Sequence, residues 1–125
     1  MDIISPSITK KVINDSATLT NADNVLVTIP RIQTGYLKQF TASNPAGSPA
    51  NLMIEDEYTP DSSTNNTNPT LVTKNCFPVV VPAAAGGANG YIVIDYGHPL
   101  SKHMGSLAIL SDTANVIISF VLELE

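Results

Sequence analysis

The sequence predicts an all-β fold: a single-domain β-sandwich, most simply a jelly roll of about eight short strands. With 125 residues, the chain has a common size for one domain. Apolar and polar residues alternate in several short segments, at the spacing expected of a sandwich. No segment carries a convincing helical stripe with caps, and the nearest, 101–110, contains Gly105. An immunoglobulin-like sandwich is the second choice, because the chain lacks Trp and a cysteine pair.

The clearest strand is the last stretch, 115–125. Its alternate residues form one wholly apolar face, and the opposite face turns polar toward its end. Turn-forming residues at 111–113 precede it. We therefore expect a strand inside a sheet, whose apolar face the rest of the chain covers. The apolar residues are Val116, Ile118, Phe120, Leu122 and Leu124.

The other strands follow from shorter alternating runs. We expect them at 8–13, 25–29, 36–42, 52–58, 71–81, 91–96 and 107–110. Turns or loops are predicted at 14–24, 43–49, 82–90 and 97–105. Within the first of these, residues 17–20 could pair briefly. The segment 82–90 is expected to be a hairpin connection or to pack against another backbone.

Four finer expectations follow from individual residues. Tyr36 and Phe40 should share one face, with Leu37 on the other. The segment 71–81 should form one strand or two, with Pro78 as the break between two, since proline cannot donate to a ladder. The segment 91–96 is apolar on both faces and should be central in its sheet. The four tyrosines should mostly be core residues.

Charge is scarce in this composition. Charged residues make up 14% and hydrophobic residues 43%, with a net charge of −5. Ser, Thr and Asn replace the missing charges, as in particle-forming proteins and in surfaces covered by partners. An ordinary β domain with a neutral surface is an equal alternative. No basic cluster lies beyond Lys10 and Lys11, so direct nucleic-acid binding is not expected.

Cysteine usage and the first residues bear on location. Cys76 is the single cysteine, which excludes an internal disulfide, and we expect a buried, inert thiol. The N-terminus lacks the basic and apolar regions of a signal peptide, and no apolar run reaches the length of a membrane span. We therefore expect a protein made in the cytoplasm, without a membrane partner.

No chemical motif predicts an enzyme. The acidic group of Glu55, Asp56, Glu57 and Asp61 lacks calcium-loop spacing, and Glu55 and Glu57 should face solvent. His98 and His103, near Asp95, are expected in a loop without a metal. There is no nucleophile elbow and no phosphate-binding loop. We predict no catalytic residue, no metal site and no cofactor.

The chain resembles the cement or decoration proteins of tailed bacteriophages. The features that carry the resemblance are the final strand 116–124, the proline-ended arm 1–6 and the small-residue loop 82–90. The resemblance implies a jelly-roll virion protein, a dimer or trimer, that stabilises the capsid by binding between major capsid subunits.

This interpretation divides the chain into an arm, 1–7, and a β-sandwich domain, 8–125. The arm and one loop end would contact the capsid or a sister subunit. The predicted partner-binding residues are Met1, Asp2, Ile3, Ile4, Ser5, Pro6 and Ser7. The alternative is a receptor- or glycan-binding head domain of a fibre or adhesin, with loops 43–50 and 59–70 touching the ligand.

Overall fold

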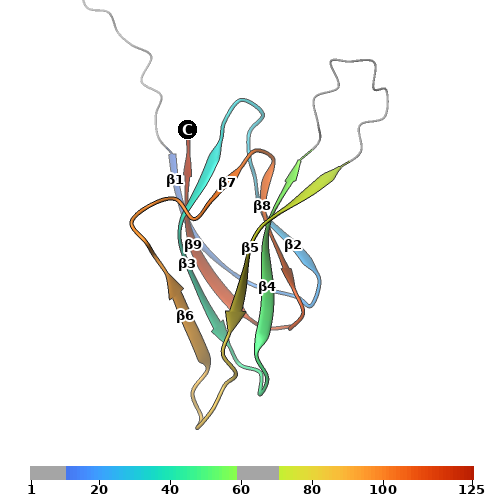
Figure 1. The fold of residues 1–125 in the computed structure, drawn as a ribbon, viewed down its shortest axis with the longest axis vertical. Coiled ribbons are helices and arrows are strands. Elements are labelled where there is room, and N and C mark those ends of the chain that lie inside the picture. Colours follow the sequence, from blue (N-terminus) through green and yellow to red (C-terminus); the bar gives the residue numbers. More distant parts are fainter. Residues whose placement is uncertain (1–10, 59–70) are drawn as a thin grey trace, which may run out of the picture.

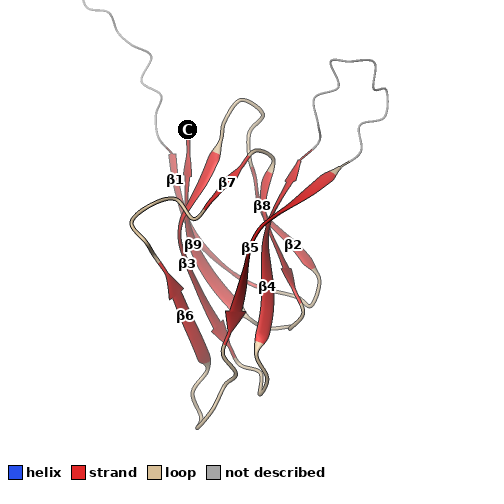
Figure 2. Ribbon diagram, viewed as in Figure 1, coloured by secondary structure: helices blue, strands red, loops and turns tan. Residues whose placement is uncertain are grey.

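Two antiparallel sheets pack face to face in the computed structural model, which describes residues 11–58 and 71–125. The described residues contain nine strands and no helix, so the fold is an all-β sandwich, as predicted (Figure 2). The predicted arm at 1–7 and the polar loop at 59–70 lie outside the described residues.

The five-stranded sheet places the last strand in its interior. Its order is β1 (Lys11–Thr18), β9 (Ile117–Leu124), β3 (Gly35–Asn44) and β6 (Gly90–Ile94). The short β7 (Ser101–His103) pairs with the first residues of β3, beyond the end of β6 (Figure 1).

The four-stranded sheet has the order β2 (Asp23–Thr28), β8 (Ser106–Ser111), β4 (Ala50–Tyr58) and β5 (Val72–Val81). Its two central strands are therefore β8 and β4, and β2 and β5 are its edges.

The core fills the space between the two inner faces. Successive side chains of a strand point to opposite sides, and the inward ones of both sheets are buried between them. The buried cluster comprises Leu19, Ile29, Leu37, Phe40, Ala42, Ala50, Leu52, Ile54, Val79, Val81, Ile94, Leu107, Ile109, Val116, Ile118, Phe120, Leu122 and Leu124.

The prediction for the last stretch is confirmed. All five residues of its apolar face are buried, and β9 pairs along its length with β1 on one side and β3 on the other. Full-length pairing with β9 also explains why β1 continues to Thr18. The turn expected from Asn14 onward is wrong there, since ladder pairing outweighs the weak strand propensity of these residues.

A bulge corrects the expected faces of β3. The register with β9 shifts between Leu37 and Gln39, so that one extra residue lies in the strand. Leu37 and Phe40 are consequently both buried, whereas Tyr36 is half-buried on the outer side. The simple alternation that separated Leu37 from Phe40 is wrong because a bulge reverses the side-chain period.

Two findings concern edge strands. β6 was expected at the centre of its sheet, which is wrong: it lies at the edge, and its outward residues Tyr91 and Val93 are exposed. β5 runs unbroken through Pro78, opposite Met53, so of the two alternatives for this segment the structure has one strand rather than two. An edge strand has a row of N–H groups that need no ladder partner, so proline is tolerated there.

Two loops at one end of the sandwich are joined by hydrogen bonds. The loops before β4 and before β6 lie side by side (Figure 1), and the Ala84 N–H donates to the Ala46 carbonyl at 2.8 Å. The buried Asn44 amide donates to the Ser48 and Pro82 carbonyls, at 2.9 and 3.1 Å. The Ala84–Ala46 bond shows segment 82–90 packed against another backbone, one of the two predicted arrangements. The segment is also tightly folded on itself, since a Cβ on Gly90 would lie 1.7 Å from the Pro82 oxygen.

Candidate functional site

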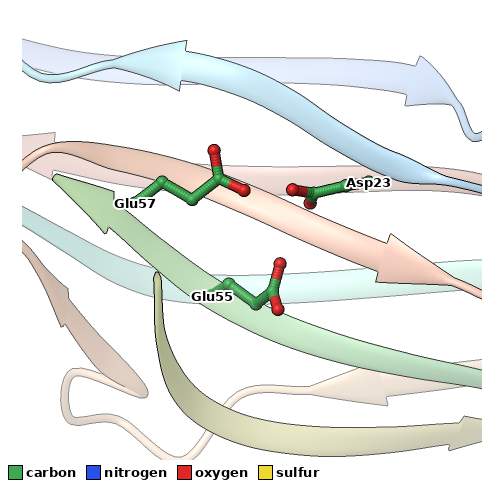
Figure 3. A group of neighbouring side chains, drawn as sticks. All are labelled: Asp23, Glu55 and Glu57. Atoms are coloured by element: carbon green, nitrogen blue, oxygen red, sulfur yellow. The ribbon is translucent and has the colours of Figure 1, made fainter. Parts of the chain in front are cut away.

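Three carboxylates converge on the outer face of the four-stranded sheet. Asp23 comes from the start of β2, and Glu55 and Glu57 come from β4 (Figure 3). One carboxylate oxygen from each lies within 4.8 Å of the others. In residues 11–58 and 71–125, this is the group of three or more His, Cys, Asp or Glu side chains whose ligand atoms are close enough to share one metal ion. We call them the carboxylate cluster.

The strand between β2 and β4 is β8, and it carries a small residue beside the cluster. Ala108 of β8 is the cross-strand neighbour of Val25 on one side and of Glu55 on the other. Directly opposed residues in a sheet have Cβ atoms only about 4.5–5.5 Å apart. Ala108 is small and wholly buried, so it leaves space for longer side chains from the two flanking strands.

Glu55 is the buried member of the cluster. Its side chain is 5% exposed, and its Oε1 has no hydrogen-bond partner among the described residues. Burial raises the pKa of Glu55 to about 7, and the adjacent Asp23 adds to this through a hydrogen bond and through charge repulsion. The expectation that Glu55 faces solvent is therefore wrong: the outer face of this sheet is itself covered at this point.

Glu57 is half-buried, and its pKa is raised as well. Its hydrogen bond to Asp23 raises its pKa to about 7, with burial and the Asp23 charge as further causes. Asp23 is exposed and lies at the solvent side of the cluster. Within the described parts of the chain, no lysine or arginine forms an ion pair with these three carboxylates. Among the described residues, the cluster thus has no protein counter-charge.

Asp56 points to the other side of β4 and is fully satisfied. Its two carboxylate oxygens accept three backbone N–H groups: Oδ2 from Met104 at 2.9 Å, and Oδ1 from Gly105 at 2.9 Å and Ser106 at 3.1 Å. These donors belong to the turn between β7 and β8. Asp56 therefore fixes the turn that carries the chain from one sheet to the other.

The two histidines occupy different environments. His103 is wholly buried in β7, where the structure has a strand rather than the predicted loop. Its Nδ1 donates to the Ser106 carbonyl at 2.8 Å, and its Nε2 lies 2.7 Å from Ser101 Oγ. Burial lowers the pKa of His103. His98 is exposed in a loop and stacks on Tyr96.

The remaining candidates are scattered. Cys76 is half-buried on the edge strand β5 rather than buried, and desolvation raises the pKa of its thiol. Asp61 and the predicted partner-binding residues 1–7 lie outside the described residues. The tyrosines are not core residues: Tyr36 and Tyr58 are half-buried, and Tyr91 and Tyr96 are exposed.

The outer face of the five-stranded sheet is a second candidate surface. Two rows of outward side chains cross β1, β9, β3 and β6 in register, and neither row contains a charged residue. We call these rows the uncharged face: Thr18, Ile117, Ser43 and Tyr91, then Ser16, Ser119, Thr41 and Val93. The Thr41 and Ser119 hydroxyls hydrogen-bond to each other across the two central strands.

Comparison with known proteins adds no family. No protein-family model matches the chain, and no curated protein or solved structure matches it significantly. In the part of the chain that the structure describes, there is no helix long and apolar enough to cross a membrane.

Proposed function

We propose that the chain is a jelly-roll virion protein that stabilises a capsid by binding between major capsid subunits, without catalysis. The nested strand pairing supports the jelly-roll arrangement. β1 pairs with β9, β2 with β8, β3 with β6 and β7, and β4 with β5, so the two halves of the chain pair like one long folded hairpin. The strand orders β1–β9–β3–β6 and β2–β8–β4–β5 are those expected of a jelly roll made of two Greek keys.

The uncharged face is the observation that carries the binding role. Its two rows place small hydroxyl side chains between the exposed apolar residues Ile117, Tyr91 and Val93. Charged residues are depleted at the centre of protein interfaces because burying them costs their hydration. Because these two rows carry no charge, they lose little hydration when another subunit covers them.

The predicted arm precedes a strand of the same sheet in the sequence. Residue 11 begins β1, the edge strand of the sheet that bears the uncharged face. Residues 1–7 would extend the contact onto the capsid or a sister subunit. Many such contacts, each of modest area, stabilise a shell by multivalency without a catalytic residue.

The environments of the reactive residues support a non-enzymatic role. His98 is exposed, His103 is buried and held by two hydrogen bonds, and Cys76 lies on an edge strand with a raised pKa. A nucleophile and its base need direct hydrogen-bond contact. The Cys76 thiol hydrogen-bonds to the Lys74 carbonyl rather than to a histidine. Ser101 Oγ does contact His103 Nε2 at 2.7 Å, but that imidazole is wholly buried and its Nδ1 is held by a backbone carbonyl.

Co-sedimentation with capsids of the encoding virus tests the proposal. Val93→Lys places a charge in the uncharged face and should weaken capsid binding by about tenfold or more. Val80→Lys is the matched control, because Val80 is 55% exposed on the edge strand β5 of the other sheet and Val93 is 54% exposed. Full binding by Val93→Lys, or no binding by the native chain, would refute the capsid role.

The arm is tested separately by deleting residues 1–7. The deletion should weaken capsid binding and leave the thermal unfolding of the sandwich unchanged. Normal decoration by the truncated chain would refute the assignment of the arm. Sedimentation of the purified protein should give a dimer or trimer.

Exposed aromatic rings favour a receptor- or glycan-binding head domain as the second candidate. Tyr91 is 59% and Tyr96 69% exposed, and Tyr96 already stacks on the His98 ring at a centroid distance of 5.9 Å. Sugars stack on such rings. Binding on a glycan array that is lost in Tyr96→Ala, without capsid binding, would favour this function over the first.

A further inference from the structure

We propose that the carboxylate cluster of Asp23, Glu55 and Glu57 is a binding site for a divalent cation, with calcium as the preferred ion. This inference goes beyond the proposed function and concerns the opposite sheet. The sequence predicts no metal here because Glu55 and Glu57 lack calcium-loop spacing, and Asp23, which is more than 30 residues away along the chain, was not considered. Only the order β2–β8–β4 brings them together.

The spacing of the ligand atoms fits one ion. A calcium ion binds oxygen at 2.3–2.6 Å, so two ligands on opposite sides of it are about 4.6–5.2 Å apart. The three carboxylate oxygens, each within 4.8 Å of the others, therefore all lie within reach of a single central ion. Figure 3 shows the three carboxylates extending from β2 and β4 toward one another above the strand between them.

The buried oxygen of Glu55 points independently to a ligand. Glu55 Oε1 is fully enclosed and accepts no hydrogen bond from the described residues. Leaving a buried carboxylate oxygen without a partner is costly. The adjacent Asp56 shows the contrast, since its buried carboxylate accepts three N–H donors. Within residues 11–58 and 71–125, the fold supplies donors to Asp56 and none to Glu55 Oε1, so this oxygen is available to bind a cation.

The donor set selects the class of ion. All three ligands are carboxylates, and neither histidine nor cysteine joins them. Zinc favours nitrogen and sulfur, whereas calcium takes six to eight oxygens, including bidentate carboxylates and water. Magnesium usually retains most of its water and uses one or two carboxylates. Asp23, exposed at the rim, leaves the outer side open to water ligands and to entry of the ion.

Binding would link β2 to β4 across β8. Calcium should therefore raise the melting temperature of the full chain relative to the same chain in EDTA. At pH about 7.5 and about 10 mM CaCl₂ we expect an increase of about 5 °C or more, and a calorimetric Kd at or below about 1 mM. MgCl₂ should bind at least about tenfold more weakly.

Three variants make the test specific. Glu55→Gln keeps the shape of the side chain and should reduce calcium affinity by about tenfold or more, with loss of the thermal shift. Asp23→Asn, at an exposed position that does not endanger folding, should do the same. Asp15→Asn is the matched control, because Asp15 is an exposed carboxylate on β1 of the other sheet, and it should bind calcium like the native chain.

Two results would overturn the site. One is a native chain that gives neither heat nor a thermal shift with CaCl₂, which would mean that a shared proton alone neutralises the cluster. The other is a calcium response that survives unchanged in both Glu55→Gln and Asp23→Asn. Neither result bears on the capsid role, which depends on Val93 and the uncharged face of the five-stranded sheet.

Discussion

The Asp56 carboxylate on β4 accepts a hydrogen bond from the backbone N–H of Gly105 at 2.9 Å, across 49 residues of sequence. The same carboxylate also accepts N–H groups from Met104 and Ser106, so one buried side chain holds the whole turn between β7 and β8. Because this turn carries the chain between the sheets, Asp56 also determines where β8 begins. The carboxylate cluster lies over that strand.

Replacing Asp56 by asparagine should destabilise the fold. An amide turns one acceptor oxygen into an NH₂ donor, which then faces a backbone donor. The expected loss is on the order of 2–4 kcal/mol in the free energy of unfolding. Urea denaturation measures it, with the exposed Asp15→Asn as control, expected within about 0.5 kcal/mol of native. Equal stability of the two variants would contradict this role for Asp56.

Gly90 should not tolerate a side chain. Its Cβ would approach the backbone oxygen of Pro82 to 1.7 Å and the backbone carbon to 2.4 Å, and neither atom belongs to a flexible side chain. Gly90→Ala should cost about 3 kcal/mol and loosen the two adjoining end loops. Gly47→Ala in the neighbouring loop meets no atom within 4 Å and should be neutral. Thermal unfolding of the two variants distinguishes them.

Ala108 should be sensitive to enlargement. It is wholly buried beneath the cluster, between Val25 and Glu55. Ala108→Leu should lower the free energy of unfolding by about 1–3 kcal/mol, since the added carbons must displace the side chains that reach over β8. Ala85→Leu, at an exposed position, should be within about 0.5 kcal/mol of native. If Ala108→Leu were as stable as the control, the space above β8 would be larger than the structure indicates.

His103 should make stability depend on pH. Its pKa is lowered by burial, so the unfolded chain binds the proton more tightly than the folded chain does. This contribution is fully present above pH about 6.5 and is lost as the pH falls through the lowered pKa. Asp56 partly opposes the shift and Lys74 adds to it.

The comparison with His103→Asn isolates that contribution. The raised pKa values of Glu55 and Glu57 act with the opposite sign, since they lower stability as the pH rises from about 4.5 to about 7. The quantity to measure is therefore the difference in unfolding free energy between native and variant chains, in EDTA. It should shrink as the pH falls below about 6.5. A constant difference would contradict the prediction.

Much of the sandwich could be predicted from local alternation. The buried face of β9 was predicted residue by residue, because a strand has a fixed side-chain period of two. The period of two does not predict burial where a strand contains a bulge. At β3 a bulge places Leu37 and Phe40 on the same side, and nothing in the alternation indicates where an extra residue is inserted.

The candidate site could be predicted only in part. Glu55 and Glu57 were recognised as neighbours on one strand face, but Asp23 was not considered, and Glu55 was expected in water. Its burial depends on β2 and β4 flanking a strand that carries alanine at the crossing. The exposure of Tyr91 likewise depends on β6 lying at an edge, which its own apolar sequence does not indicate.

The sequence by itself determined that this chain forms short strands with one apolar side, and that the last strand has a wholly apolar face to bury. These properties follow from side-chain period and from the cost of leaving apolar surface in water. Only the tertiary structure decided which strands are neighbours, and therefore which charges meet. Strand pairing joins residues distant in the chain through backbone hydrogen bonds that are alike at every position. The meeting of Asp23 with Glu55 and Glu57 is thus a property of the strand order, not of any segment alone.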